Sequence, residues 1–509
     1  MQLISSYEEK GNKSMRMMGI DLGTTNRKVG LFDETGELIG QVSRPTETVD
    51  SNEGFVTYDP EALWNDVATM IRELMAAYGT EPVAYIGITS MAESGLLVNR
   101  STGAVQSPFL PWFETCSAPQ AERIRREGTP LELFQRTGLH LSFKHGLAKL
   151  LWLKERDPDM FDDAVWLSVS GYIAYRLTGV MACDPTLATR TYAYSIPNQA
   201  WDKEWIRHFG LNEDVFPEVR PSGVPLGSVT AATAAALHLP EGAAVAIGGH
   251  DHVCAALAVG AVDPGDVYVS MGTAETLVGT IEKRALGQAE FETGLSYGFH
   301  VVPGYHFWMG GNASSGGAVE WIRRQLADEA LSYEQIKELM VEVNDGPGEA
   351  MFFPYLSGSG APFPNSRTRA ALIGLAQSHG KKELLRAVFE GTAYQLEMIR
   401  QSAERNSEHA IRFMRAVGGG TRLPAWLQMK ADISNITLVV PPIEEATMLG
   451  AACAAALGAG YYGNAEEVRV AMQSRGVVEY APDAVRHERY RQAFEERYVP
   501  MAAHLRGLS

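Results

Sequence analysis

Hydrophobic residues recur along the chain with two different periods, which predict helices and strands in alternation. Residues 60–78 carry apolar side chains at the three- and four-residue spacing of an amphipathic helix, and one face is formed by Leu63, Val67, Met70, Ile71 and Leu74. The short apolar run 83–89 is typical of a buried strand. The same alternation continues in the second half of the chain, so we expect an α/β fold.

Two similar hairpins interrupt this alternation. In the first, residues 18–33 predict a strand, a Gly-Thr turn at Gly23 and a returning strand. In the second, residues 267–281 repeat the order around Gly272. The two glycines lie 249 positions apart (272 minus 23), close to half of the 509 residues. Glycine lets backbone N–H groups approach phosphate oxygens and threonine adds a hydroxyl, so the sequence predicts two similar halves, each with a phosphate-binding turn.

A carboxylate precedes the second hairpin. Asp251 follows the predicted strand 243–247 and two glycines, and it is flanked by His250 and His252. The two histidines have no further evident ligands nearby, so they do not indicate a zinc site. Asp251 is therefore a candidate for chemistry on a substrate held near the two turns.

Composition excludes several classes of partner. A net charge of −17 disfavours nucleic acid and anionic membranes, and no apolar run approaches the ~20 residues of a membrane span. The first 17 residues lack the apolar core of a secretory signal. The cysteines show neither metal-ligand nor redox spacing; they are Cys116, Cys183, Cys254 and Cys453. We expect a cytoplasmic protein that acts on a small molecule.

The length of the chain indicates two domains, because 509 residues exceed one ordinary core. We place the boundary near Gly248, which gives an amino-terminal domain over residues 15–247 and a carboxy-terminal domain over residues 248–509. The polar residues 1–14 are expected to form a disordered extension. The sequence leaves the oligomeric state open, and a homodimer remains one alternative.

Two long patterns resemble the FGGY family of carbohydrate kinases. The segment DLGTTNRKVGLFDETGEL, residues 21–38, is similar to the opening of that family, and residues 370–390 are similar to its carboxy-terminal pattern. The resemblance extends from about Met18 to Gly460. It implies two ribonuclease H-like (actin-like ATPase) domains, each a mixed sheet flanked by helices, with the active site in the cleft between them. The first would bind sugar and phosphate and the second would bind nucleotide.

The resemblance also assigns roles in the transfer of the ATP γ-phosphoryl group to a hydroxyl of a sugar or polyol. Asp251 would be the catalytic base, and Asp21 would hold Mg²⁺ directly or through water. The glycines of the loop 308–317 and of the turn after strand 416–417 would lie against the nucleotide. The expected contacts to ATP are Asp21, Gly23, Thr24, Thr25, Lys28, Gly272, Thr273, Gly316, Gly418, Gly419 and Gly420.

Three residues are candidates for binding the acceptor. Glu93 follows the strand 83–89, at the sheet edge where ligands of α/β folds bind. Trp112 is suited to stack on a sugar, although it could equally be a core residue, and Glu114 could bind hydroxyls or be a solvated surface acid. The family's usual Arg near Cys116 is absent, and the pair Ala92-Glu93 matches neither the glycerol-type nor the xylulose-type pattern. The acceptor therefore stays open.

Two other functions remain alternatives. The same fold serves ATPases that phosphorylate no small molecule, and the missing arginine allows a degenerate relative that binds sugar without turnover. The pattern G-x-G-x-x-G at residues 458–463 follows a predicted helix and not a strand, so it does not indicate a dinucleotide site.

Overall fold

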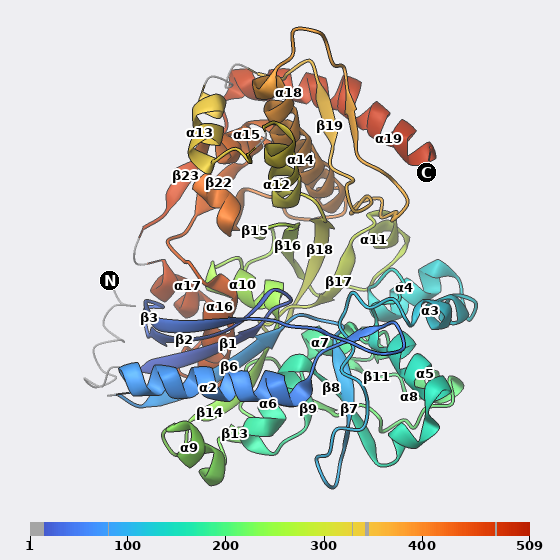
Figure 1. Cartoon of the computed structure of the whole chain (residues 1–509), viewed down its shortest axis with the longest axis vertical. Helices are drawn as coiled ribbons and strands as arrows, with labels where there is room; N and C mark the ends of the chain where they lie inside the picture. Colours follow the sequence, from blue (N-terminus) through green and yellow to red (C-terminus); the bar gives the residue numbers. More distant parts are fainter. Residues whose placement is uncertain (1–14, 80, 328, 342–345, 474–475, 509) are drawn as a thin grey trace.

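The computed structural model describes residues 15–508 apart from 80, 328, 342–345 and 474–475. The expected disordered extension, residues 1–14, lies outside the described residues. The described chain contains two large mixed sheets with helices around them, one above the other in Figure 1. None of its helices combines the length and the apolar character needed to cross a membrane.

The first sheet has six strands in the order β13-β14-β6-β1-β2-β3. β1, β2 and β3 form an antiparallel meander, whereas β6 and β14 are added in parallel to β1. Apolar side chains fill both faces of the central strands, which explains the continuous apolar run of β6. The bounds are β1 Arg16–Leu22, β2 Asn26–Asp33, β3 Leu38–Pro45, β6 Val83–Ser90, β13 Gly227–Ser228 and β14 Ala244–His250.

The second sheet has seven strands in the order β17-β18-β16-β15-β21-β22-β23. β15, β16 and β18 form an antiparallel meander, and β21 and β22 are added in parallel to β15. The bounds are β15 Val267–Met271, β16 Glu275–Glu282, β17 Ser296–Phe299, β18 Tyr305–Asn312, β21 Phe413–Val417, β22 Thr437–Val440 and β23 Val478–Tyr480.

The two sheets share one topology. The series β3-β2-β1-β6-β14 and the series β18-β16-β15-β21-β22 have the same order and the same strand directions. In each series the Gly-Thr turn joins the first two strands of the meander. The expectation of two similar halves, each an α/β unit with a mixed sheet, is therefore confirmed by the strand order.

Helices cover both faces of the sheets. In the first half α2 packs on β2 and β3, and its buried face holds every residue predicted for it. In the second half α14 packs on β18 and β19 (Met351–Phe353), while α15 packs on β22 and on α14. The bounds are α2 Pro60–Tyr78, α5 Gly146–Arg156, α6 Val169–Thr178, α7 Pro185–Thr189, α12 Gly316–Gln325, α14 Lys381–Glu404 and α15 Pro424–Ser434.

One predicted loop is wrong in most of its length. Residues 308–317 were expected to be a small-residue loop, but residues 308–312 belong to β18, which pairs with β16. Only three residues separate β18 from α12. The small side chains led to the loop interpretation, but here they allow close packing: a Cβ on Gly310 would lie 2.6 Å from a methyl group of Leu295.

Two helices connect the halves. α10 (Asp251–Ala258) contacts β14 of the first sheet and β15 and β16 of the second, and it packs along α16 (Ala446–Gly458), as Figure 1 shows. α16 comes from the carboxy-terminal half but lies on β1, β6 and β14 of the first sheet. Residues of both helices share a hydrophobic cluster with β15 and β16.

This packing brings backbones into direct contact. A Cβ on Gly87 of β6 would lie 1.8 Å from the carbonyl oxygen of Ala451, and a Cβ on Gly450 would lie 1.9 Å from that of Cys254. No real Cβ occupies such a position without a shift of the backbone. The glycines therefore fix how closely α16 approaches the first sheet and α10.

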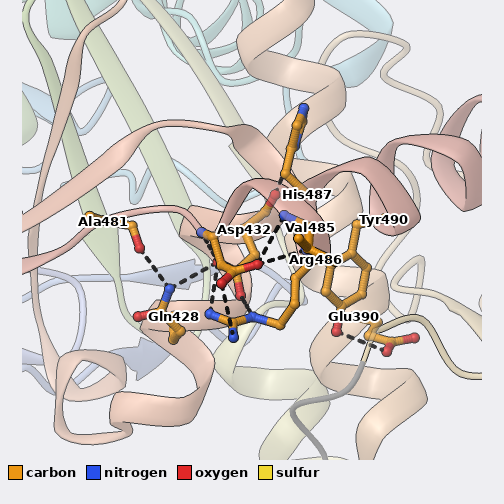
Figure 2. A network of polar contacts seen from close by, with 9 residues as sticks. Glu390, Gln428, Asp432, Ala481, Val485, Arg486, His487 and Tyr490 are labelled. Atoms are coloured by element: carbon orange, nitrogen blue, oxygen red, sulfur yellow. Dashed lines mark hydrogen bonds and ion pairs between the residues drawn. The ribbon is translucent and has the colours of Figure 1, made fainter.

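Helix α18 (Ala484–Ala493), which precedes the last described helix, is held by buried acids of the second half. Asp432 of α15 accepts a hydrogen bond from Arg486 Nε at 2.6 Å (Figure 2). It also accepts the backbone N–H of Asp483 at 2.8 Å. Tyr490 donates to Glu390 of α14 at 3.4 Å. The charged helix α18 thus packs against the core of the second half through Tyr490 and Ala493.

We predict that Gly87→Ala destabilises the protein by about 1–3 kcal/mol, the usual cost of overpacking. The added methyl group would meet a carbonyl oxygen of α16 and push that helix away from β6. The midpoint of thermal unfolding measures the effect. Gly507→Ala is the matched control, because a Cβ there meets nothing within 4 Å. Equal midpoints for the two variants would contradict the close contact.

Candidate active site

Parallel strands bring the first group of predicted residues to one edge of the first sheet. β1, β6 and β14 end side by side and in register. Asp21 lies one residue before the end of β1, Glu93 three residues after β6, and Asp251 is the first residue of α10 directly after β14. The structure therefore brings together three acids that are far apart in sequence.

Asp21 and Asp251 interact electrostatically at this edge. Burial and the negative charge of Asp251 raise the pKa of Asp21 to about 8, although the ammonium group of Lys28, its partner across β1 and β2, lowers it. The Oδ1 atom of Asp21 is buried and has no hydrogen-bond partner among the described residues. From the second sheet, Tyr268 lies near both carboxylates. The two carboxylates thus lie where the halves meet.

A hard cation fits this pair. Carboxylate oxygens are the ligands Mg²⁺ prefers, and a cation would satisfy the unpartnered Asp21 Oδ1. Within the described ranges, no group of three or more His, Cys, Asp or Glu side chains encloses a metal position. Asp21 could supply an oxygen ligand, and Mg²⁺ usually keeps water or phosphate oxygens as its other ligands.

The raised pKa of Asp21 predicts a pH-dependent stability. The unfolded carboxyl group loses its proton near 3.8 and the folded one near 8, so the folded state becomes less favourable as the pH rises from about 4 to 8. In EDTA, Asp21→Asn should therefore raise the midpoint of thermal unfolding at pH 8, where we expect the free energy of unfolding to increase by at least about 1 kcal/mol. At pH 5 the increase should be smaller.

Asp50→Asn, at an exposed carboxylate of the β4 strand (Val49–Asp50), is the control and should leave the midpoint unchanged at both pH values. A gain for Asp21→Asn that is the same at pH 5 and pH 8 would contradict the raised pKa.

Hydrogen bonds fix the junction of β14 and α10, and with it Asp251. Gly249 has φ 129°, and a Cβ there would lie 2.8 Å from Thr186 Oγ1. That oxygen accepts the N–H of His250 at 2.7 Å and donates to buried Asp184 at 2.7 Å. Burial lowers the pKa of His250 to about 4, and its Nδ1 lies 3.4 Å from Asp251 Oδ1. A neutral imidazole therefore borders the Asp251 carboxylate.

The first Gly-Thr turn presents its threonines to solvent. The turn is closed by the N–H of Gly23, which donates to the carbonyl of Asn26 at 3.0 Å. The side chains of Thr24 and Thr25 are exposed, and Thr24 Oγ1 accepts the indole N–H of Trp112 at 2.8 Å. A predicted acceptor residue and a predicted phosphate residue are thus directly bonded.

Lys28 has a partner that the sequence did not suggest. Its Nζ lies 2.7 Å from Oε2 and 3.0 Å from Oε1 of Glu445, the residue before α16. We predicted contacts to phosphate for Lys28, and in this structure its ammonium group binds a carboxylate of the other half. The pair is partly buried, with side-chain exposures of 26% and 17%.

The second sheet brings its predicted turns to one edge in the same way. β15 and β21 are parallel, so the turns after them are neighbours, and a Cβ on Gly418 would lie 2.9 Å from the Met271 carbonyl oxygen. The amide of Gly316 donates to the Gly272 carbonyl at 3.1 Å. The residues collected here are Gly272, Thr273, Gly316, Gly418, Gly419 and Gly420.

A fully buried ion pair lies behind these turns. Lys430 of α15 lies 2.7 Å from Oε1 of Glu275, and both side chains are 0% exposed. Glu275 also accepts a hydrogen bond from Ser315 Oγ, just before α12, at 3.2 Å. One carboxylate therefore connects the strand after the Gly-Thr turn, the start of α12 and the helix after the Gly418 turn.

We predict that Lys430→Met destabilises the protein by about 3–5 kcal/mol, because it leaves the Glu275 carboxylate buried without its cation. The double variant Glu275→Gln, Lys430→Met should recover most of the loss in thermal unfolding. Lys337→Met is the control: its pair with Glu334 is solvent-exposed, and removal of such a pair costs about 0–1 kcal/mol. A double variant as unstable as Lys430→Met alone would refute the coupling.

Glu93 is bound to an arginine that sequence reasoning missed. Arg190, just after α7, donates from Nε to Glu93 Oε1 at 2.8 Å and from Nη2 to the same oxygen. Burial would raise the pKa of Glu93, but Arg190 and neighbouring cations hold it at about 2. Glu93 adopts φ 61°, a conformation rare for non-glycine residues, and its carbonyl accepts from Lys149 Nζ at 2.7 Å.

Trp112 and Glu114 occupy different positions. Trp112 is half-buried, with the Lys144 ammonium 4.7 Å from its ring centre. Glu114 is buried, and its two oxygens accept the backbone N–H groups of Val56 at 2.7 Å and Cys116 at 2.9 Å. Trp112 is therefore placed beside the phosphate turn, whereas the Glu114 carboxylate is used to hold backbone.

The residues that sequence reasoning missed have weak signals. Arg190 lies within the stretch that resembles the FGGY family, from about Met18 to Gly460, but its spacing in the sequence does not indicate contact with Glu93. Lys144 lies two residues before α5, and nothing in its sequence neighbourhood indicates contact with Trp112. Both become visible only when the loop after β6 and the ends of α5 and α7 are seen together.

The paired sheets and the acids between them define an enzyme of the two-lobed, actin-like ATPase class. Models of the FGGY family of carbohydrate kinases match the chain twice, the N-terminal domain model over residues 16–258 and the C-terminal domain model over residues 267–459. The chain belongs to the FGGY family of carbohydrate kinases, which are phosphotransferases with an alcohol group as acceptor.

Individual relatives agree with this family. The chain is 26% identical to a xylulose kinase of Bacillus subtilis, covering 97% of this chain and 98% of the relative. It is 27% identical to a glycerol kinase of Gloeobacter violaceus, and the alignment covers 89% of this chain and 90% of the relative. The crystal structure of a xyloylose kinase from Brucella ovis superposes with a TM-score of 0.88 at 24% identity, covering 97% of this chain and 100% of that one.

Proposed function

We propose that this protein transfers the γ-phosphoryl group of ATP to a hydroxyl group of a small sugar, ketose or polyol. One observation carries the proposal: Asp251 lies beside Asp21 and close to the Glu93–Arg190 pair, at the sheet edge that also bears the first Gly-Thr turn. An acceptor held there has a carboxylate for its hydroxyl and a phosphate turn on either side.

Asp251 orients the acceptor hydroxyl and accepts its proton late in the transfer. A loose transition state requires positioning more than a strong base, and the bonds from Thr186 to His250 supply that positioning. His250 stays neutral, since burial lowers its pKa to about 4. The imidazole therefore adds no positive charge that would weaken Asp251 as a proton acceptor.

The nucleotide would lie between the two Gly-Thr turns. Thr24 and Thr25 face the phosphates from the first half and Gly272 and Thr273 from the second, with the Gly418–Gly420 turn beneath the adenosine. Mg²⁺ would neutralise charge on the phosphates, and Asp21 would hold it directly or through water. Glu445 would then compete with phosphate for Lys28, which has to exchange partners for phosphate contact.

We also propose that residues 15–247 and 248–509 act as sugar and nucleotide domains that close on their substrates. α10 and α16 lie between them and are the contacts about which closure would occur. Glu93 and Trp112 would contact the acceptor. The bonds of Glu114 to backbone N–H groups suit a supporting role for that residue.

The proposal predicts sugar-stimulated ATP turnover that depends on Asp251. ADP release should be measured with a panel of ketoses, polyols and sugar acids, with nucleotide affinity followed separately. Asp251→Asn should lower kcat by at least about 10²-fold and leave nucleotide affinity similar, because it removes the proton acceptor alone.

The control is Asp50→Asn, at an exposed carboxylate of the β4 strand, which should retain full turnover. Basal ATP hydrolysis that no acceptor stimulates would identify an ATPase of the same fold. Acceptor binding without turnover would identify a degenerate relative.

A further inference from the structure

Two cationic side chains near the proposed acceptor position keep hydrogen-bond donors that have no partner within the described ranges. The Nζ of Lys144 makes no hydrogen bond or ion pair with any residue that the structure describes, and it lies 4.7 Å from the centre of the Trp112 ring. The Nη1 of Arg190 is buried and also lacks a hydrogen-bond partner in the described part of the chain. A donor group that is shielded from water costs stability unless something accepts its hydrogen bond.

The acids around them are already bonded. Glu93 uses its Oε1 for Arg190. Glu114 uses both oxygens for backbone N–H groups. Asp184 accepts from Thr186 at 2.7 Å and from Ser222 at 2.7 Å. None of these carboxylates hydrogen-bonds Lys144 Nζ in the described part of the chain, although Glu93 attracts it electrostatically.

The neighbouring histidines do not change this balance of charge. Burial lowers the pKa of His145 to about 3, so it is neutral at pH 7, and its ring stacks on Tyr192 with centres 4.9 Å apart. His250 is neutral for the same reason and lies on the Asp251 side. Burial also lowers the pKa of Lys144, because removal from water disfavours the charged ammonium group.

We propose that the acceptor of this kinase is a polyhydroxy carboxylic acid, whose carboxylate binds Lys144 and the free N–H of Arg190 while a hydroxyl group faces Asp251. The inference rests on the proposed kinase function. A single negative charge matches one unpaired ammonium group. A sugar phosphate would bring nearly two charges toward Glu93 and Asp251, which makes it a poorer match.

Trp112 supports the orientation of such a substrate. Its ring lies under the Lys144 ammonium and its N–H is bonded to Thr24 on the first phosphate turn. The carboxylate end of the acceptor would therefore bind on the Lys144 side of Trp112. The phosphoryl group would arrive on the Thr24 side.

The test compares acids with their uncharged counterparts of the same chain length. ADP release should be measured for gluconate against glucitol, xylonate against xylitol and erythronate against erythritol, with xylulose, glycerol and gluconate 6-phosphate included. At least one acid should exceed its alditol by about tenfold or more in kcat/KM, the ratio expected for hydrogen bonds to a charged group.

Lys144→Met should bring the ratio of kcat/KM values close to one, mainly because the KM of the acid rises. In the unaltered enzyme the KM of the acid should rise with salt concentration. Lys203→Met, at an exposed lysine of α8 (Lys203–His208), is the matched control and should keep the ratio. A purely structural role for Lys144 would lower turnover of acids and alditols alike.

The possible outcomes distinguish failure of this inference from failure of the proposed kinase function. Phosphorylation of neutral sugars or alditols in preference to acids would overturn the inference and leave the kinase intact. Preference for gluconate 6-phosphate would overturn the choice of a single carboxylate. Absence of turnover with every acceptor would overturn the kinase function and the inference together.

Discussion

The close contact of α16 with the first sheet and with α10 determines where every other part of the site lies. At Gly87 and Gly450 the backbones approach to a distance that excludes a Cβ. Because of this contact, Glu445 before α16 reaches Lys28 on β2, and the amino end of α10 places Asp251 beside Asp21. A bulkier residue in this contact would change distances between charges, and in a partly buried site such changes alter pKa values and affinity strongly.

The carboxylates at the junction of the two halves repel one another electrostatically in the ligand-free protein. The pKa of Asp21 is raised by burial and by Asp251, and Glu445 adds further negative charge. This arrangement costs stability in the free protein, but it provides oxygen ligands for a cation and a carboxylate for a hydroxyl. A carboxyl group whose pKa is strongly raised by burial and by a neighbouring acid, as that of Asp21 is, is typical of catalytic sites. Repulsion between carboxylates therefore lowers the stability of the ligand-free protein at the position where substrate and metal would bind and reduce that repulsion.

Much of this was predictable because local rules fix it. The helix 60–78, the strand 83–89 and both Gly-Thr turns follow from periodicity and turn chemistry, and the acids at strand ends follow from the sheet. The partners of charged side chains did not follow, because Arg190 meets Glu93 and Lys28 meets Glu445 only through tertiary contacts. The loop prediction for residues 308–312 was wrong for a related reason. Small residues in this stretch suggest a loop, but in the structure they allow close packing within a strand.

Arg190 bears on whether the chain is a degenerate relative. The family's usual arginine near Cys116 is absent, which on sequence alone suggests a lost sugar site. The structure supplies a guanidinium group to Glu93 from α7, and that helix is capped by Asp184, whose bonds through Thr186 also hold the backbone before Asp251. The arginine and the carboxylate are thus positioned by one network. Within the described chain, the unpartnered Nη1 of Arg190, the left-handed backbone of Glu93 and the unpaired Lys144 ammonium each cost stability without a ligand, so their combination favours a retained acceptor site.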